Sequence, residues 1–235
     1  MNETVLLTGG SGGLGSVVCS KLLAEGYKII SVDRSHHDSK DSDNLVYVHL
    51  DLNDLESIPS ALVDLDFDHL VLVHGVLEAK NFLDLTVEDF TSPLRINFLS
   101  NFIITQLAIK KWLSNKSKIN FSDNTVTYIS SVATKGASQT EVPYLTSKRA
   151  FEGVLLACAR EFSDDGIRSN VISPGIMNVG MGESVLRERP DVLDRLPIKS
   201  PTDPKEIADL IIYLLKAKHV TGQNMHVNSG RYFSI

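Results

Sequence analysis

Two kinds of hydrophobic segment alternate along the chain. Short runs rich in Val, Ile and Leu are followed by longer stretches in which apolar residues recur every three or four positions. This alternation is typical of repeated β-α-β units around a parallel sheet whose strands are buried on both faces. The short runs predict strands at Thr4–Thr8, Lys28–Asp33, Leu45–Leu50, His69–His74, Thr125–Ser131, Arg168–Ile172 and Asn224–Val227. The longer stretches predict helices at Gly13–Glu25, Leu55–Leu65, Pro93–Leu113, Pro143–Phe162 and Pro204–Lys216.

These elements predict one α/β domain over residues 1–235, a doubly wound parallel sheet of about seven strands with helices on both faces. The polar loops His36–Asn44 and Ser114–Asn124 are too short to be linkers between domains. Residues Met181 to Asp203 show only weak periodicity, which predicts a mobile flap. A site is expected beside it, at the carboxyl ends of the strands.

Composition narrows the function classes. The formal charge of −6 disfavours nucleic acid as a partner. The chain starts without a basic, signal-like segment, and apolar runs such as Leu210–Leu215 are far shorter than a membrane span, so neither secretion nor a membrane is expected. Cys19 and Cys158 lie in helical patterns without metal-ligand spacing, which predicts two buried thiols, no metal site and a cytoplasmic location.

A glycine-rich loop joins the first predicted strand to the first predicted helix. Glycines at this junction allow the backbone to approach a pyrophosphate, whose charge is met by the N–H groups of the helix N-terminus. The pattern therefore predicts a dinucleotide site, the alternative being a glycine-rich turn without a ligand. Its candidate residues are Thr8, Gly9, Ser11, Gly12, Gly13, Leu14 and Gly15.

An acidic residue, Asp33, ends the second predicted strand. A carboxylate at this position accepts hydrogen bonds from the adenosine ribose hydroxyls and repels a 2′-phosphate, which favours NAD(H) over NADP(H). Arg34 follows and would attract that phosphate, so NADP(H) stays possible. Asp51, after the third strand, is either a partner of the adenine amino group or an N-cap of the next helix.

Tyr144 and Lys148 lie four residues apart on a predicted helix and therefore share one face. An ammonium near the phenol would lower its pKa and let Tyr144 exchange a proton with a substrate oxygen. Ser130 and Ser131 end a strand upstream, and Asn97 is a polar residue in an otherwise apolar helix.

Together these motifs resemble the compact branch of the short-chain dehydrogenase/reductase family over almost the whole chain. The resemblance implies a Rossmann-type sheet and an NAD(P)-dependent oxidoreductase that acts on a small carbonyl or alcohol substrate. It implies Tyr144 as acid/base, Lys148 on the nicotinamide ribose, Ser131 on the substrate oxygen and Asn97 in a proton relay. Ser131 is preferred to Ser130 because its spacing to Tyr144 fits the family better. The implied cofactor site also includes Leu52, His74, Gly75, Tyr144, Lys148, Pro174, Gly175 and Ile176.

The chain departs from the family pattern in two places. Leu72-Val73-His74-Gly75 stands where relatives have Asn-Asn-Ala-Gly, so His74 is either an additional polar group of the site or a strand-end residue bonded to backbone. Val179 stands where relatives have a Thr that binds the nicotinamide carboxamide, which leaves Asn178 or backbone for that contact. These departures keep open an alternative function, a dinucleotide-binding sensor or scaffold with little turnover.

The two longest predicted helices carry apolar residues on more than one side, which predicts burial against a second copy. Relatives pair these helices across a two-fold axis, so a homodimer or homotetramer is expected. The residues concerned are Phe98, Phe102, Ile103, Leu155 and Leu156. Substrate-lining candidates mix apolar residues with Lys135, Gln139, Glu141 and Arg187, which suits a small carbonyl, a sugar or an acyl thioester alike.

Overall fold

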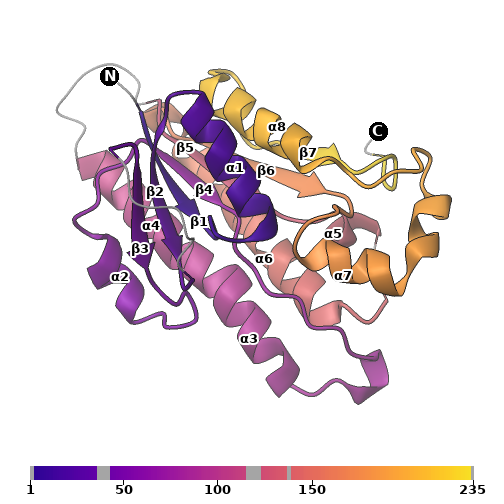
Figure 1. Ribbon diagram of the computed structural model, residues 1–235. Coiled ribbons are helices and arrows are strands. Elements are labelled where there is room, and N and C mark those ends of the chain that lie inside the picture. The colour runs from indigo at the N-terminus through magenta and orange to yellow at the C-terminus, as the bar shows by residue number, and fades with distance from the viewer. Residues whose placement is uncertain (1–2, 36–42, 115–122, 137–138, 234–235) are drawn as a thin grey trace.

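A seven-stranded parallel sheet forms the centre of the protein in the computed structural model, which describes residues 3–35, 43–114, 123–136 and 139–233 (Figure 1). Its strands are β1 Thr4–Thr8, β2 Lys28–Asp33, β3 Leu45–His49, β4 His69–Leu72, β5 Thr125–Ile129, β6 Arg168–Pro174 and β7 Asn224–Val227. Their order across the sheet is β3-β2-β1-β4-β5-β6-β7, and each neighbouring pair is parallel. The order reverses between β1 and β4, which confirms the predicted doubly wound topology.

The strands differ from their predicted bounds only at their carboxyl ends. β3, β4 and β5 stop one or two residues early, and β6 continues to Pro174. His74 and Ser130 lie just beyond the carboxyl ends of β4 and β5, and their side chains form hydrogen bonds to other elements. The residues that the pattern assigned to strand ends therefore belong to the site.

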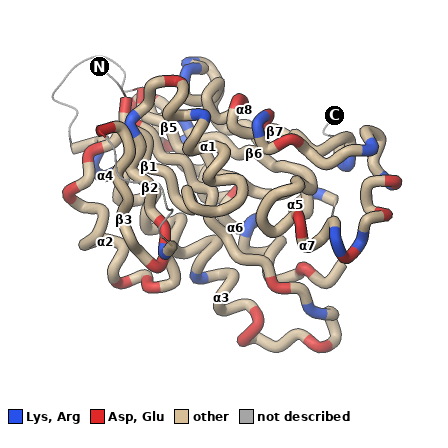
Figure 2. Tube along the Cα trace, viewed as in Figure 1, with Lys and Arg blue, Asp and Glu red and all other residues tan. Residues whose placement is uncertain are grey.

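Helices cover both faces of the sheet. They are α1 Gly13–Ala24, α2 Ser57–Leu62, α3 Thr91–Leu94, α4 Asn101–Ser114, α5 Ala133–Gly136, α6 Val142–Glu161, α7 Met181–Glu188 and α8 Pro204–Lys216. α1 and α8 lie side by side on one face, and α2, α4 and α6 cover the other (Figure 1). Charged residues lie mostly in helices and loops, with Lys and Arg interspersed among Asp and Glu in the view of Figure 2.

Alternate residues of the central strands supply the two halves of the core. Leu6, Leu70 and Tyr128 face α4 and α6, where Ile104 and Phe151 pack against them. The neighbouring strand residues, including Leu7 and Val71, face α1 and α8. Cys19 and Cys158 are free thiols, buried one in each half of the core, as the helical patterns predict.

The long helix predicted at Pro93–Leu113 is interrupted. α3 continues into a π-helical segment, Arg95–Ser100, before α4 begins. The cause is competition for carbonyl groups, because the Ser100 hydroxyl donates to Ile96 O at 2.6 Å and the Asn101 amide donates to Asn97 O at 2.9 Å. Side-chain donors that enter the helical ladder are a recognised cause of such a local widening.

Two further segments differ from the prediction. The helix expected at Leu55–Leu65 is shorter, at Ser57–Leu62. The stretch expected as an irregular flap contains α7 and a 3₁₀ turn at Pro190–Arg195. α7 has only eight residues and none of them is buried, so it lacks the long apolar face by which a helix is recognised in a sequence.

Within the described ranges, no helix combines the length and the hydropathy needed to cross a membrane. The same part of the chain holds no group of three or more His, Cys, Asp or Glu side chains that are arranged to bind a metal ion.

Candidate active site

A cavity of about 460 Å³ opens at the carboxyl edge of the sheet, where the loops after β1 to β6 meet the N-terminal half of α6. It is lined by every predicted cofactor residue except Thr8. Of the predicted catalytic residues, Ser131, Tyr144 and Lys148 line it and Asn97 does not. One cavity thus brings together predicted site residues that are up to 167 positions apart, from Gly9 to Ile176.

The glycine loop gives the cavity an uncapped helix N-terminus. Gly12 is the N-cap of α1 and makes no side-chain hydrogen bond to the first turn. Its own N–H donates to Gly9 O at 3.0 Å, which closes the tight turn. A Cβ on Gly15 would collide with that carbonyl oxygen, so only glycine allows the helix to start this close to β1. The first-turn N–H groups are therefore available to an anion such as a pyrophosphate.

Asp33 lies at the end of β2 beside this loop. Its carboxylate accepts hydrogen bonds from Ser11 N–H at 3.2 Å and Ser35 N–H at 3.1 Å, which fixes its orientation. Arg34 also lines the cavity. Asp51 lines it too, and its carboxylate accepts from Asn53 N–H at 2.9 Å. The N-cap alternative for Asp51 is wrong, because the N-cap of α2 is Glu56.

Tyr144 and Lys148 project from the first two turns of α6 into the opposite part of the cavity, and both are buried. The Tyr144 hydroxyl is hydrogen-bonded to the Ser131 side chain. Lys148 Nζ donates to Ile129 O at 2.9 Å and lies 4.8 Å from the centre of the Tyr128 ring. The predicted catalytic side chains Ser131, Tyr144 and Lys148 are therefore neighbours at the carboxyl end of β5.

Burial controls the protonation of this group. It raises the pKa of Tyr144 to about 12, against the opposing effect of the Ser131 hydrogen bond. Burial also lowers the pKa of Lys148 to about 7. The expectation that Lys148 lowers the pKa of Tyr144 is wrong for this state, because burial dominates and a lysine with a pKa of about 7 is already neutral where a phenol with a pKa of about 12 titrates. Tyr144 therefore holds its proton at neutral pH.

Asn97 is fully buried in the π-helical segment and holds two parts of the site together. Its Oδ1 accepts from Val76 N–H at 2.8 Å, and its Nδ2 donates to Val76 O and to Ser147 Oγ, each at 2.9 Å. A Cβ on Gly75 would lie 3.0 Å from both Asn97 Oδ1 and Lys148 Nζ. Glycine at position 75 thus permits Asn97 and Lys148 to approach the same turn.

At position 74 the chain has a histidine where relatives have alanine, and this histidine is neutral and held in place by hydrogen bonds. Its Nδ1 lies 2.7 Å from Thr8 Oγ1, and its Nε2 lies 3.1 Å from Ile96 O and 2.8 Å from Ser100 Oγ. Because a carbonyl oxygen only accepts, Nε2 carries the hydrogen and Nδ1 accepts from Thr8. Burial, followed by the charge of Lys148, lowers the pKa of His74 to about 3. His74 is bonded both to backbone and to side chains, and it joins β1, β4 and the π-helical segment.

Other lining residues were not singled out for the cofactor site. Glu141, Arg189 and Arg231 carry charge into the cavity, and the carboxylate of Glu141 lies 3.8 Å from Arg189 Nη2. Arg187 and Asn178 do not line it, so Asn178 is not in place to substitute for the carboxamide-binding Thr. Arg189 lies between α7 and the following 3₁₀ turn, and Arg231 lies after β7, where no periodic pattern marks them.

Comparison with known proteins agrees with this geometry. Residues 9–231 match the model of a family described as enoyl-(acyl carrier protein) reductase. The chain is 29% identical over 252 residues to acetoacetyl-CoA reductase of Acinetobacter sp. (strain RA3849), with 98% of each chain covered. It superposes with a TM-score of 0.90 and 25% identity on 4-hydroxyisoleucine dehydrogenase complexed with NADH, over 100% of both chains. A crystal structure of an Agrobacterium tumefaciens protein with bound NADP gives a TM-score of 0.88 at 24% identity, over 97% and 96% of the two chains.

Proposed function

The chain belongs to the short-chain dehydrogenase/reductase family and is an NAD(P)-dependent oxidoreductase, and on that premise we propose how its residues divide the work. We propose that it moves a hydride between the nicotinamide and the carbon of a secondary alcohol or ketone while Tyr144 moves the proton at oxygen. The observation that carries this proposal is the convergence of Ser131, Tyr144 and Lys148 in the cavity that also contains the uncapped N-terminus of α1. No observation favours a sensor or scaffold.

The residues of the cavity fit a dinucleotide. The N–H groups of the first turn of α1 suit the pyrophosphate, because no side chain caps them. Asp33 suits the two adenosine ribose hydroxyls, since its carboxylate is held in place by two backbone N–H groups. We propose NAD(H) as the preferred form on the charge of Asp33. Related structures were solved with NADH and with NADP, so their ligands do not decide the preference.

When bound, the dinucleotide supplies or accepts the hydride at its nicotinamide C4. Tyr144 donates its proton to the substrate oxygen during reduction, a role that suits a phenol whose pKa of about 12 keeps it protonated. Ser131, hydrogen-bonded to Tyr144, orients the same oxygen. Lys148 binds the nicotinamide ribose, and its pKa near 7 allows its amine to exchange protons with neighbouring polar groups of the site. Asn97 holds the turn at Val76 against α6 and stays the proposed member of a proton relay.

We propose a single domain over residues 1–235 that carries both cofactor and substrate sites, and a homodimer or homotetramer formed through α4 and α6. Phe102 is 38% exposed and Leu156 is 63% exposed, which supports an apolar contact surface at these helices. Of the other residues expected there, Leu155 is buried in the core, so that expectation is wrong for it, whereas Phe98 and Ile103 are partly buried and stay in the proposal. Free thiols at Cys19 and Cys158 support a cytoplasmic location.

The proposal is tested with a panel of carbonyls and secondary alcohols, followed by nicotinamide absorbance with both NAD(H) and NADP(H). The variant Tyr144→Phe removes one hydroxyl and should lower turnover about 100-fold or more on any accepted substrate, the usual contribution of general acid/base catalysis. Dinucleotide affinity, measured by fluorescence titration, should stay unchanged. Undiminished turnover in Tyr144→Phe would show that another group carries the proton.

A further inference from the structure

Glu152 lies on the face of α6 that carries the site. It follows Tyr144 by eight residues and Lys148 by four, so the three side chains follow one another along a single helix face. Glu152 is only 8% exposed, which is unusual for a carboxylate unless it is paired. It does not line the cavity and therefore contacts neither substrate nor cofactor.

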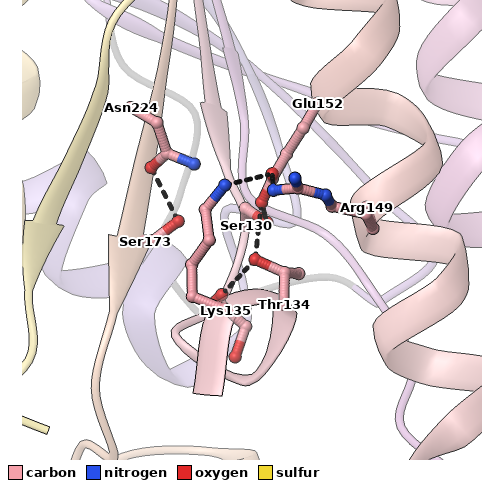
Figure 3. Close-up of polar contacts among 8 residues, drawn as sticks. Ser130, Thr134, Lys135, Arg149, Glu152, Ser173 and Asn224 are labelled. Carbon is pink, nitrogen blue, oxygen red and sulfur yellow. Dashed lines mark hydrogen bonds and ion pairs between the residues drawn. The ribbon is translucent and has the colours of Figure 1, made fainter. Parts of the chain in front are cut away.

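One oxygen of Glu152 accepts hydrogen bonds from the residue before Ser131 and from the residue three positions after it. Oε1 accepts from Ser130 Oγ at 2.6 Å and from Thr134 Oγ1 at 2.7 Å (Figure 3). Thr134 Oγ1 also lies 2.9 Å from Ser131 O, and Thr134 N–H donates to the same carbonyl at 3.1 Å. The turn that carries Ser131 is thus bonded to Glu152 both before and after the catalytic residue.

The other oxygen of Glu152 pairs with two cationic side chains that lie nearer the surface. Oε2 lies 2.7 Å from Arg149 Nη1 and 3.4 Å from Lys135 Nζ (Figure 3). Burial alone raises the pKa of Glu152, but the hydroxyls of Ser130 and Thr134, with Lys135 and Arg149, bring it below its ordinary value. A carboxylate that stays ionised accepts stronger hydrogen bonds from hydroxyl groups than a neutral acceptor does.

We propose that Glu152 is a positioning residue that holds the Ser131 turn in register with Tyr144 and Lys148. α6 carries the acid/base, the ammonium and this carboxylate on one helix, while Ser131 lies in the turn between β5 and α5. Without Glu152, Ser131 would keep the bond from Ala133 N–H to its Oγ, at 3.1 Å, its bond to Tyr144 and the backbone bonds of its neighbours to β6. It would lose the carboxylate that ties the backbone of its turn to α6 through Ser130 and Thr134. An error of about 1 Å in such a group costs up to about 100-fold in rate.

The inference rests on the proposed function, and a double-mutant cycle tests it through Ser131. Glu152→Ala should lower kcat about 10-fold or more, with the dinucleotide Kd unchanged. Glu152→Gln keeps an Oε1 that accepts both hydroxyls and should stay within about 2-fold of the unmodified enzyme. In a Ser131→Ala background, Glu152→Ala should have no further effect on kcat, because the residue that it positions is gone.

Two variants separate positioning from mere folding. Thr134→Val removes one of the two hydroxyl bonds at similar volume and should give a smaller loss of kcat than Glu152→Ala, again only when Ser131 is present. Arg149→Gln removes the half-exposed ion pair and should leave kcat within about 2-fold, since such pairs contribute little. If Glu152→Ala does not fold, Thr134→Val and Glu152→Gln decide the matter in its place.

The outcomes for the Glu152 and Thr134 variants test the positioning role, and the outcome for Tyr144→Phe tests the proposed function. Equal losses of kcat from Glu152→Ala or Thr134→Val with and without Ser131 would overturn the positioning role, as would a Glu152→Gln enzyme as slow as the alanine variant. Full activity in Tyr144→Phe would instead overturn the proposed function itself, whatever the Glu152 variants do.

Discussion

The buried Lys148 should make the site a source of instability, which predicts that Lys148→Met yields an inactive but more stable protein. The side chain is 2% exposed and its pKa is lowered from 10.5 to about 7 by burial. Methionine fills a similar volume without a charge. Activity should be lost and dinucleotide binding weakened, because the ribose contact goes with the ammonium.

The magnitude follows from the pKa displacement. Moving a pKa from 10.5 to about 7 corresponds to a cost of about 5 kcal/mol for holding the ammonium in the folded state. In the methionine variant the carbonyl of Ile129 loses its charged donor, which destabilises the variant by about 1 to 3 kcal/mol and offsets part of the gain. Near pH 6 the variant should therefore be about 2 to 4 kcal/mol more stable.

The sign of the pH dependence is specific. Between pH 7 and 10.5 the unfolded chain binds a proton at position 148 that the folded protein does not, so the unmodified protein gains stability as pH rises, and the full cost applies below pH 7. The advantage of Lys148→Met should shrink by about 3 kcal/mol from pH 6 to pH 9.

Urea unfolding of the protein without dinucleotide, followed by fluorescence of Trp112, the one Trp of the chain, measures this at each pH. Protein concentration is held constant, because assembly would also shift the midpoint. Lys110→Met, at an exposed position of α4, is the matched control and should show no such pH-dependent difference. A Lys148→Met protein that is less stable at pH 6, or whose advantage is equal at both pH values, would refute the reasoning.

Two further perturbations test other parts of the site and surface. Asp33→Ala should reduce the preference for NAD(H) by about 10-fold or more in the ratio of Kd values, because the two ribose hydroxyls lose a charged acceptor; tighter binding of NADP(H) by the unmodified protein would instead show that Arg34 governs the choice. Leu156→Glu should shift the protein toward monomer in light scattering, because a charge would enter the contact proposed at α6, and a concentration-independent monomer before mutation would contradict the proposed oligomer.

The sequence predicts the strands and the site residues on them better than it predicts how the site is held together. The strands are marked by short runs rich in Val, Ile and Leu, and the positions of Asp33, Ser131 and Tyr144 at their predicted places follow from the parallel topology, which collects carboxyl ends at one edge. Their spacing along the chain is therefore sufficient to assemble them.

Side-chain competition for backbone groups is not visible as a pattern. Ser100 reads as an interior helix residue, yet its bond to Ile96 O helps break the helical ladder. His74 satisfies both ring nitrogens on partners 66 and 22 residues away, Thr8 and Ile96. The burial that sets the pKa values of Tyr144 and Lys148 likewise depends on the tertiary packing around the pair and not on its four-residue spacing.

Because of the π-helical segment, the function of the site depends on the number of residues between Leu94 and Asn101. A π turn contains about one residue more than an α turn, so it is equivalent to a single-residue insertion in an α-helix. Deleting one residue there, such as Leu99, would allow a regular helix but rotate Asn97 by about 100° relative to α4. Because α4 is anchored on the sheet through Ile104 and Ala108, the rotation would fall on Asn97 and take its amide away from Val76. Any natural or engineered deletion in this segment should therefore leave the hydrophobic core intact and damage the active site.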